Sequence, residues 1–533
     1  MHQMNHNATQ LITTAMLLIA ATNALAADAQ HAHNKAPKLI IGIAVDQLRT
    51  DYIYALESRL CDGGLRLLLD KGLIYEHVVF DVDNPDGTSA LATLATGAYA
   101  FHNGVPSKEV YNAQMLRKQS VFYDKDYIGN STDATYSARN LIGTTLADEL
   151  KTASSGSSRI FSVAPDAEQA IIAAGHTGNG AFWIDDKSGK WASTTYYKDF
   201  PNYLERKNKD RPLSFVLSEA VWEPMQPTKG ALDIMPYHYE TGSFSHTFYQ
   251  FGQPCIPWFK ASPLVNDAIV EFSKILLTTG SLGQGKTSDM LQITFYAGTW
   301  QHEAPEDFAA ELQDMYLRLD KSISNLLAIV DKQIGFENAF IYLTGTGQTN
   351  AKTNDDEGTR QGIFTASRCT SLLNSYLVSV YGQGQYVVDY ADNQIYLNHR
   401  TIEQQNLKLS DVQQTAAEFV MMFSGVEDVV TQFQILHNDT NDRIRRIRRS
   451  YCRSNGGDLV VTLQPGWVFK YNDSSDEQPQ VRHDMASGPA IIFAPGVKAE
   501  RITTPVDASS IAPTVASKIR IRAPSGAKSI SLK

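Results

Sequence analysis

The chain has 533 residues, of which 43% are hydrophobic and 20% are charged, and its formal net charge is −10 at pH 7. This composition is ordinary for a globular protein and provides enough apolar residues for a large core. The negative net charge argues against general nucleic-acid affinity, which needs a basic face, so we expect no nucleic-acid partner.

The N-terminal region has the pattern of a signal peptide. An apolar segment at 11–21 is followed by Ala-Leu-Ala at 24–26, an A-x-A pattern suited to signal peptidase. The apolar segment is too short to span a bilayer, no other run reaches about 18 apolar residues, and we expect no transmembrane segment. We therefore predict a signal peptide over 1–26, a polar spacer over 27–37, and export to the periplasm or cell envelope.

The first predicted strand follows the spacer. From Leu39 to Val45 the chain is almost continuously apolar, which indicates a strand buried on both faces. Parallel strands of this kind end at the mouth of the active crevice in α/β proteins. Asp46, directly after the run, is therefore a candidate metal ligand, and a helix N-cap or turn aspartate is the open alternative.

The next feature is a turn, Gly87-Thr88-Ser89, ahead of an Ala/Leu-rich stretch at 90–97. This order places hydroxyl groups at a helix N-terminus, where the helix dipole and free N–H groups favour a phosphate-like anion. Thr88 and Ser89 are candidate nucleophiles. The alternative is that one of them simply caps the helix.

From Ala36 onward apolar strands alternate with helical stretches, among them a long amphipathic stretch at 308–334. This alternation predicts an α/β fold with a large, mainly parallel sheet flanked by helices on both faces, over 38–533. A looser stretch at about 177–286, rich in Pro, Tyr and Trp, is the predicted inserted cap. Further predicted strands are 160–163, 291–295, 339–344, 459–463 and 490–493.

The four cysteines are far apart and form no CxxC pair. After export they could form up to two disulfides, with free buried thiols as the alternative. They are Cys61, Cys255, Cys369 and Cys452.

A basic cluster lies near the C-terminal third of the chain, where five arginines between 443 and 449 are interleaved with Ile444 and Ile447. This pattern indicates the solvated face of a helix or ribbon rather than a binding site.

Several short motifs follow one another over almost the whole mature chain. They lie at 45–52, 63–69, 95–97, 140–150, 173–176, 316–321 and 511–514. Together they resemble the alkaline phosphatase superfamily, in particular the phosphate-insensitive bacterial alkaline phosphatases and the type I phosphodiesterase/nucleotide pyrophosphatases. The resemblance implies the alkaline phosphatase-like fold and a site in which two zinc ions activate a Thr or Ser nucleophile.

The implied site residues are largely replaced. Asp46 is the one implied metal ligand that matches. The nucleophile position falls at Gly87, which leaves Thr88 as a substitute, although a shift of one residue turns a side chain by about 100° around a helix. The position of the phosphate-holding Asn falls at Lys108, which could contact an anion.

Two implied phosphate-gripping cations fall at Asp166 and Glu168, so that the charge is reversed where a trianionic transition state needs stabilisation. The second metal cluster falls at Thr299 and Glu303, with His302 adjacent, so His302 and Glu303 are candidate ligands. The remaining implied ligand positions read Thr346, Gly347 and Gln478, with His483 and Asp484 following.

We therefore predict an exported pseudoenzyme: a phosphatase-like protein that has lost its activity, needs no cofactor, and serves as a binding or structural component that contacts an unknown envelope protein or ligand. The first alternative is an active phosphomonoesterase or phosphodiesterase with a rearranged zinc site on Asp46, His302 and Glu303. The second alternative is a glycan- or ligand-binding module that uses the aromatic residues of the predicted cap, although such aromatics usually pack in cores.

Overall fold

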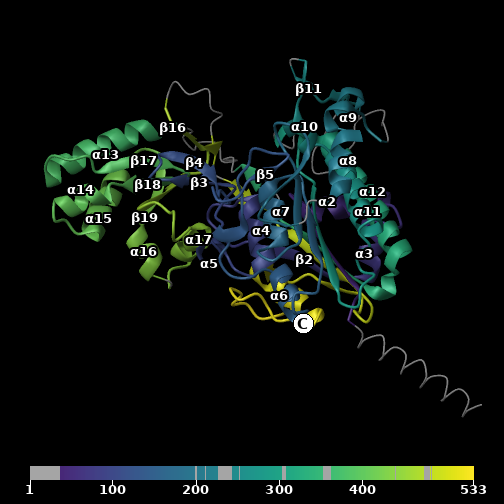
Figure 1. The fold of residues 1–533 in the computed structure, drawn as a ribbon. Helices are drawn as coiled ribbons and strands as arrows, with labels where there is room; N and C mark the ends of the chain where they lie inside the picture. The colour runs from purple at the N-terminus through teal and green to yellow at the C-terminus, as the bar shows by residue number, and fades with distance from the viewer. Residues whose placement is uncertain are drawn as a thin grey trace, which may run out of the picture.

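The structure of the chain, a computed structural model, describes residues 36–198, 201–210, 212–225, 243–250, 252–302, 308–347, 349–351, 362–438, 440–472, 480–481 and 483–532. An eleven-stranded sheet lies at its centre, in the order β25-β2-β24-β14-β1-β13-β6-β7-β8-β5, with β26 beside β2 (Figure 1). The predicted signal peptide lies outside the described residues. The predicted α/β fold with a large, mainly parallel sheet is confirmed.

The central strand is β1 (Leu39–Asp46), which pairs in parallel with β13 (Asp289–Tyr296) on one side and with β14 (Ala339–Gly345) on the other. Because helices cover both faces of these strands, both sets of alternating side chains are buried, which explains the continuous apolar run. Asp46 ends β1, so the strand delivers this carboxylate to the carboxyl edge of the sheet.

Strands on either side complete the sheet. β6 (Ile160–Val163) and β7 (Gly180–Ile184) extend the parallel set beyond β13, whereas β24 (Gly488–Phe493) runs antiparallel to β14. β2 (Leu73–Val79) is antiparallel to β24, and β8 (Trp191–Thr194) is antiparallel to β7. At the two ends of the sheet, β25 (Glu500–Ile502) and β26 (Val506–Asp507) pair with β2, and β5 (Gly129–Asn130) pairs with β8.

Helices form a layer on each face of the sheet (Figure 1). α3 (Leu65–Lys71), α11 (Leu264–Thr278) and α12 (Ala309–Ile334) share one apolar core with alternate residues of β1. α12 confirms the helix expected at 308–334, because its apolar stripe from Leu312 to Val330 is buried. The opposite face carries α4 (Gly87–Thr96), α6 (Leu146–Ala153), α7 (Ala167–Ala174) and α18 (Ile511–Lys518).

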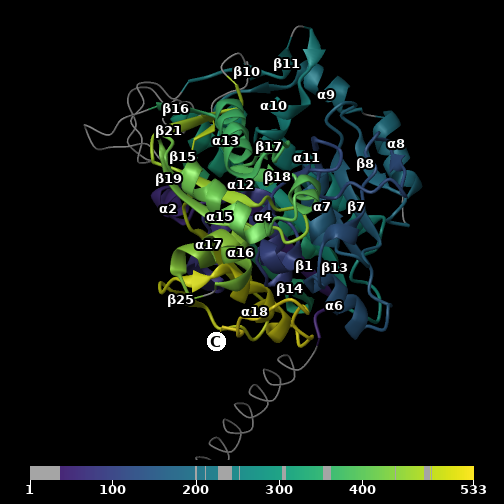
Figure 2. The same ribbon diagram turned by 90° about the vertical axis from the view of Figure 1, so that its left-hand side faces the viewer.

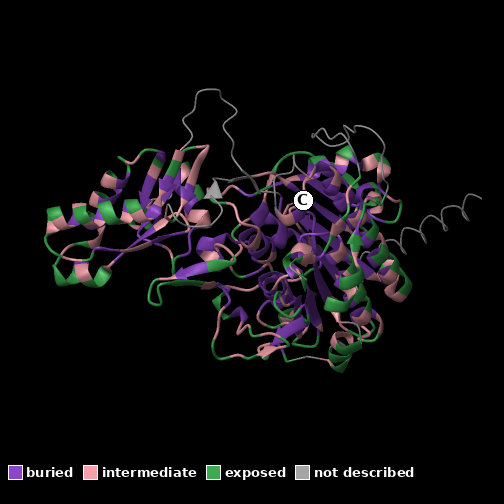
Figure 3. Cartoon of the chain, turned by 90° about the horizontal axis from the view of Figure 1, so that it is seen from above, coloured by how far each residue is buried: buried purple, intermediate pink, exposed green. Residues whose placement is uncertain are grey.

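A second lobe, residues 362–472, lies beside the sheet and has a buried interior of its own (Figure 3). Its antiparallel sheet has the order β17-β18-β20-β19, and α13 (Ala366–Tyr381) and α15 (Leu409–Val420) cover it. The strand predicted at 459–463 is β20 of this lobe and not a strand of the central sheet. The other three strands are β17 (Val387–Ala391), β18 (Gln394–Leu397) and β19 (Val426–Thr431).

The predicted cap, 177–286, is more closely joined to the main body than its sequence indicates. β7, β8 and α11 all fall within this range and belong to the central sheet or to its helical layer. The cap boundaries therefore stay a prediction. Several aromatics that were considered as a glycan platform are buried in the core instead, namely Phe182, Trp183, Trp191, Tyr197 and Phe248.

The arginine cluster forms the helix α17 (Asp442–Ser450), one of the two expected alternatives, but its face is not simply solvated. Asp81 of the main body accepts from Arg446 Nε at 2.8 Å and from Arg449 Nη1 at 2.7 Å. The guanidinium of Arg448 lies 4.1 Å from the ring centroid of Phe101, which also belongs to the main body. These contacts attach the lobe to the sheet through ion pairs and a cation–π interaction.

All four cysteines are free thiols, so the structure favours the alternative without disulfides. Cys369 is buried in the core of the lobe, and Cys452 is buried with its Sγ 3.6 Å from the carbonyl oxygen of Gly104. In the part of the chain that the structure describes, no helix combines the length and hydrophobicity that a bilayer span requires.

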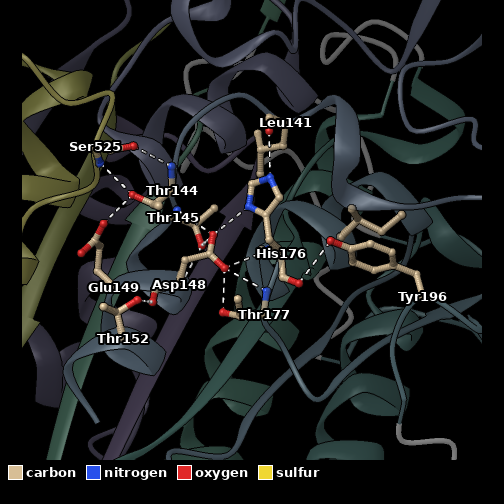
Figure 4. Close-up of polar contacts among 12 residues, drawn as sticks. Leu141, Thr144, Thr145, Asp148, Glu149, Thr152, His176, Thr177, Tyr196 and Ser525 are labelled. Atoms are coloured by element: carbon tan, nitrogen blue, oxygen red, sulfur yellow. Dashed lines mark hydrogen bonds and ion pairs between the residues drawn. The ribbon is translucent and has the colours of Figure 1, made fainter. Parts of the chain in front are cut away.

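The motif Ala-Ala-Gly-His at 173–176 belongs to a buried polar network (Figure 4). His176 Nδ1 lies 3.0 Å from Asp148 Oδ2, and His176 Nε2 lies 2.9 Å from the carbonyl oxygen of Leu141, so both ring nitrogens face acceptors. Asp148 also accepts from the backbone N–H of Thr145, the N-cap of α6. Gly175 has φ +65°, and a Cβ there would lie 2.3 Å from Thr145 Oγ1, so glycine is required.

The network shifts both ionisable groups toward their charged forms. The hydrogen bond to Asp148 raises the pKa of His176 above its usual value of 6.5, although burial acts in the opposite direction. Burial alone would raise the pKa of Asp148, but hydrogen bonds from His176 and Thr145 lower it below its usual value. The pair therefore stabilises the fold as an imidazolium and a carboxylate.

We expect His176→Ala to lower the free energy of unfolding by about 2 kcal/mol at pH 6, because it leaves a buried carboxylate without its charged partner. The raised pKa of His176 makes its contribution fully present below pH 6.5 and lost as the pH rises through the folded-state pKa. The loss measured by urea unfolding should therefore be smaller at pH 9 than at pH 6. An equal loss at both pH values would contradict a charged pair.

Candidate functional site

The carboxyl edge of the parallel strands brings together residues from four segments. Asp46 ends β1, Gly87 begins α4, Asp166 is the N-cap of α7, and Thr346 follows β14. The sequence separations between them are large, and the strand order β14-β1-β13-β6 is what makes them neighbours. The topology thus supports the expectation that Asp46 lies in the crevice at this edge.

Hydrogen-bond donors of the protein occupy both carboxylate oxygens of Asp46. The Thr346 hydroxyl donates to Oδ1 at 3.0 Å, and Gln169 Nε2 donates to Oδ2 at 3.4 Å. Thr346 is held in place because its hydroxyl oxygen accepts from the backbone N–H of Gln47 at 2.8 Å. Threonine therefore stands where the resemblance implies a metal-binding aspartate, and its hydroxyl donates a hydrogen bond to Asp46.

The electrostatic surroundings of Asp46 are unfavourable for its charge. Burial raises its pKa to about 6, the hydrogen bond from Thr346 opposes this rise, and the carboxylates of Asp166 and Asp86 add to it. In a zinc site a divalent cation would act in the opposite direction and hold the carboxylate ionised. Among the protein's own side chains, the charges that act most on Asp46 are the two carboxylates, Asp166 and Asp86.

The N-terminus of α4 is capped by Asp86, whose Oδ1 accepts from the backbone N–H of Ser89 at 2.9 Å. Neither Thr88 nor Ser89 is therefore the cap. A Cβ at Gly87 would lie 2.9 Å from Asp46 Oδ1, so the implied nucleophile position faces Asp46 and has no side chain. Thr88 is half-buried one residue further along the helix.

Lys108 lies in an ion cluster that the sequence did not reveal. Asp166 Oδ1 is 2.8 Å from Lys260 Nζ and 3.6 Å from Lys108 Nζ, and Lys260 also pairs with Asp186 at 2.5 Å. The carboxyl group of Glu168, buried nearby, accepts from the Ser120 hydroxyl. The carboxylates that stand where the resemblance implies cations, Asp166 and Glu168, thus have lysines beside them. The carboxylates in turn balance the charges of these lysines.

The pKa of Lys108 reflects this cluster. Burial alone would lower it, but the carboxylates of Asp166, Glu168 and Asp186 raise it above its usual value. Lys108 is half-exposed, so an anion could reach its ammonium group. To form the predicted contact, the anion would have to compete with Asp166 for Lys108.

Two of the other implied metal positions, Thr299 and Gly347, are unsuited to zinc. Thr299 is buried, and its carbonyl oxygen accepts from the Tyr296 hydroxyl at 2.8 Å. Gly347 has φ +71°, and a Cβ there would lie 1.9 Å from the carbonyl oxygen of Ala486, so the local backbone has no room for a histidine. Glu303 and Gln478 lie outside the described residues, as do the side chains of His302, His483 and Asp484.

The described residues as a whole contain no group of three or more His, Cys, Asp or Glu side chains that could hold a metal ion. Zinc sites are built from three or four such ligands, and Asp46 alone does not meet this requirement. The donor set that the structure describes therefore does not fit the two zinc ions that the resemblance implies.

Comparison with solved structures identifies the class of fold. The crystal structure of the alkaline phosphatase PafA matches with a TM-score of 0.77 and 21% identity, covering 93% of this chain and 98% of that one. The central sheet and its helical layers thus have the fold of this alkaline phosphatase.

Comparison of sequences identifies the family. The model of the family "Type I phosphodiesterase / nucleotide pyrophosphatase" matches residues 40–486, and the chain belongs to this family. Its relatives include an alkaline phosphatase, PhoV, from Synechococcus elongatus, which is 27% identical over 92% of this chain and 91% of the relative. A protein described as a calcium-transporting ATPase from Myroides odoratus is 26% identical over 92% of this chain and 93% of the relative.

We expect Asp46→Asn to make the protein more stable than the wild type at alkaline pH. Because the folded-state pKa of Asp46 is about 6, the unfolded chain loses this proton first, and wild-type stability falls as the pH rises. The advantage of the variant should grow by about 2 kcal/mol between pH 4.5 and pH 8, as measured by urea unfolding with a chelator present. A variant less stable than the wild type at pH 8 would contradict the raised pKa of Asp46.

Gly347→Ala should lower the free energy of unfolding by about 3 kcal/mol, because the new Cβ must displace the Ala486 carbonyl and the positive φ is strained. Gly156→Ala is the matched control, since Gly156 also has a positive φ but has open space around it. The loss in free energy of unfolding is measured for both variants by chemical denaturation. Equal losses would mean that the backbone at 347 can relax and accept a side chain.

Proposed function

We propose that this protein is a member of its family without phosphatase activity, and that it acts as a binding or structural component of the cell envelope. The observation that carries the proposal is the state of Asp46. Its two oxygens accept from Thr346 and Gln169, and no metal-binding group of side chains surrounds it in the described part of the chain. Without a Lewis acid the family's chemistry has no means of activating a hydroxyl.

The ion cluster at Asp166 also argues against phosphatase activity, because it opposes the binding of a phosphorylated substrate. A phosphoryl group needs free cations, yet Asp166 already accepts from Lys260 and lies within 3.6 Å of Lys108. A phosphate entering here would have to displace a carboxylate and approach Glu168 and Asp186 as well. Repulsion by these groups would oppose the charge that develops in phosphoryl transfer.

The position at the start of α4 supplies a third argument. Gly87 faces Asp46 but offers no nucleophilic atom, and Thr88 is turned by about 100° around the helix from that position. A single substitution could account for one missing function, but here the nucleophile, the metal ligands and the cations are replaced together. The fold is retained while the reacting groups are not.

The envelope location rests on the N-terminal pattern, an apolar segment at 11–21 followed by Ala-Leu-Ala at 24–26. Export would place the protein in the compartment where an envelope protein or ligand could bind to it. Such a partner need not use the phosphatase site.

The competing function is phosphate-ester hydrolysis, and the relatives named as alkaline phosphatases favour it. It would require zinc on Asp46 with His302 and Glu303, and attack by Thr88 or Ser89. In this case the bonds from Thr346 and Gln169 to Asp46 would have to break when the metal binds.

Zinc content decides between the two functions. After incubation with zinc and desalting, we expect mass spectrometry of the purified mature protein to find far less than one zinc ion per chain, and no hydrolysis of 4-nitrophenyl phosphate or its diester. About two zinc ions per chain with hydrolysis would overturn the proposal. In that event Thr88→Ala and Ser89→Ala would identify the nucleophile, because only the variant that lacks it should lose activity.

A further inference from the structure

A large cavity lies at the end of the sheet opposite the site around Asp46. Its volume is about 1190 Å³, and it is lined by residues from the starts of β1 and β14, the C-terminal ends of α6 and α18, and β25 (Glu500–Ile502). Figure 2 shows these elements in the lower half of the view. Pockets that bind small molecules typically measure roughly 300 to 1,000 Å³, so this space is large enough for a sizeable ligand. None of the residues at the carboxyl edge of the sheet lines it.

The depth of the cavity is apolar because it opens into the core between the sheet and the helices α6 and α18. Ile40, Leu73, Leu150, Phe340 and Ile519 line it, and all five belong to one buried cluster. These side chains come from strands and helices of the main body, so the apolar wall is fixed by the fold. Such a wall suits a hydrocarbon chain, which gains free energy roughly in proportion to the apolar area removed from water.

The mouth of the cavity is basic, in contrast to the chain as a whole. Lys38, Lys286, Lys498, Lys518 and Arg520 line it. Two carboxylates, Glu337 and Glu500, lie among them, so the formal charge of the lining is positive in a chain whose net charge is −10. This arrangement attracts an anionic group to the entrance.

We propose that this cavity binds a free long-chain carboxylate, with the hydrocarbon chain in the apolar depth and the carboxylate at the lysine-rich mouth. The apolar wall favours a hydrocarbon chain, and the basic mouth favours an anionic head group. The enclosed volume fits a single amphiphile, whereas a membrane would need an exposed surface. The cavity shares no lining residue with the site around Asp46. The proposal therefore does not depend on whether the protein hydrolyses phosphate esters.

The test is titration calorimetry of the mature protein with decanoate, dodecanoate and tetradecanoate, each below its micelle concentration. We expect saturable binding near one molecule per chain, with Kd falling by up to about fourfold for each added methylene, the factor that corresponds to burying one CH₂. Absence of binding, or binding with no dependence on chain length, would overturn the proposal.

Two variants locate the site. Val497→Trp, in the lining, should block the chain and weaken binding of tetradecanoate at least tenfold, while a melting curve verifies folding. Lys498→Glu with Lys518→Glu should weaken carboxylate binding about three- to tenfold but leave binding of the uncharged alcohol of the same length unchanged. Lys125→Glu with Lys190→Glu is the matched control, since these exposed lysines do not line the cavity.

Sedimentation with anionic vesicles separates a free amphiphile from a lipid surface. We expect no cosedimentation with phosphatidylglycerol vesicles under conditions in which monomeric tetradecanoate binds. Cosedimentation that Lys498→Glu with Lys518→Glu abolishes, without binding of the monomeric carboxylate, would overturn the proposal and assign the basic mouth to a membrane surface.

Discussion

A carboxylate buried at the end of the central strand must be compensated, and the means of compensation determines what this edge of the sheet can do. In this protein the Asp46 carboxylate is stabilised by neutral donors, the Thr346 hydroxyl and the Gln169 amide. Because such donors offset burial only partly, the pKa of Asp46 stays near 6, whereas a bound divalent cation would lower it. The rest of the edge follows the same principle, since Asp166 is paired with Lys260 of the same chain.

Much of the fold could be predicted from the sequence because its signals are local. A few consecutive residues are enough to indicate that a segment is a buried strand or an amphipathic helix. This holds for the run ending at Asp46, for the strands near 160, 339 and 490, and for the apolar stripe of α12. The second lobe was missed because its strands are short and antiparallel and carry no signal of which sheet they join. The attachment of α17 was missed for a related reason, since Asp81 lies more than 360 residues before Arg449.

The candidate site could be predicted at the positions where a residue follows a well-marked strand or starts a helix. Asp46 and Gly87 are of this kind, and the structure places them face to face. Gln169, Lys260 and Asp186 were not identified, because their roles depend on how α7 and the segment before α11 pack against the sheet. Gly347 illustrates a further limit: the sequence shows a missing ligand, while only the backbone shows that a side chain there would meet the Ala486 carbonyl.

The second lobe has its own sheet and core, and α17 joins it to the main body through Asp81 and through an arginine over Phe101. Contacts between charged groups at a partly exposed junction weaken as salt screens them. Substitutions on the outer surface of the lobe would leave the core of the central sheet intact. The lobe is thus the part of the molecule in which recognition can diverge between relatives while the shared scaffold stays the same.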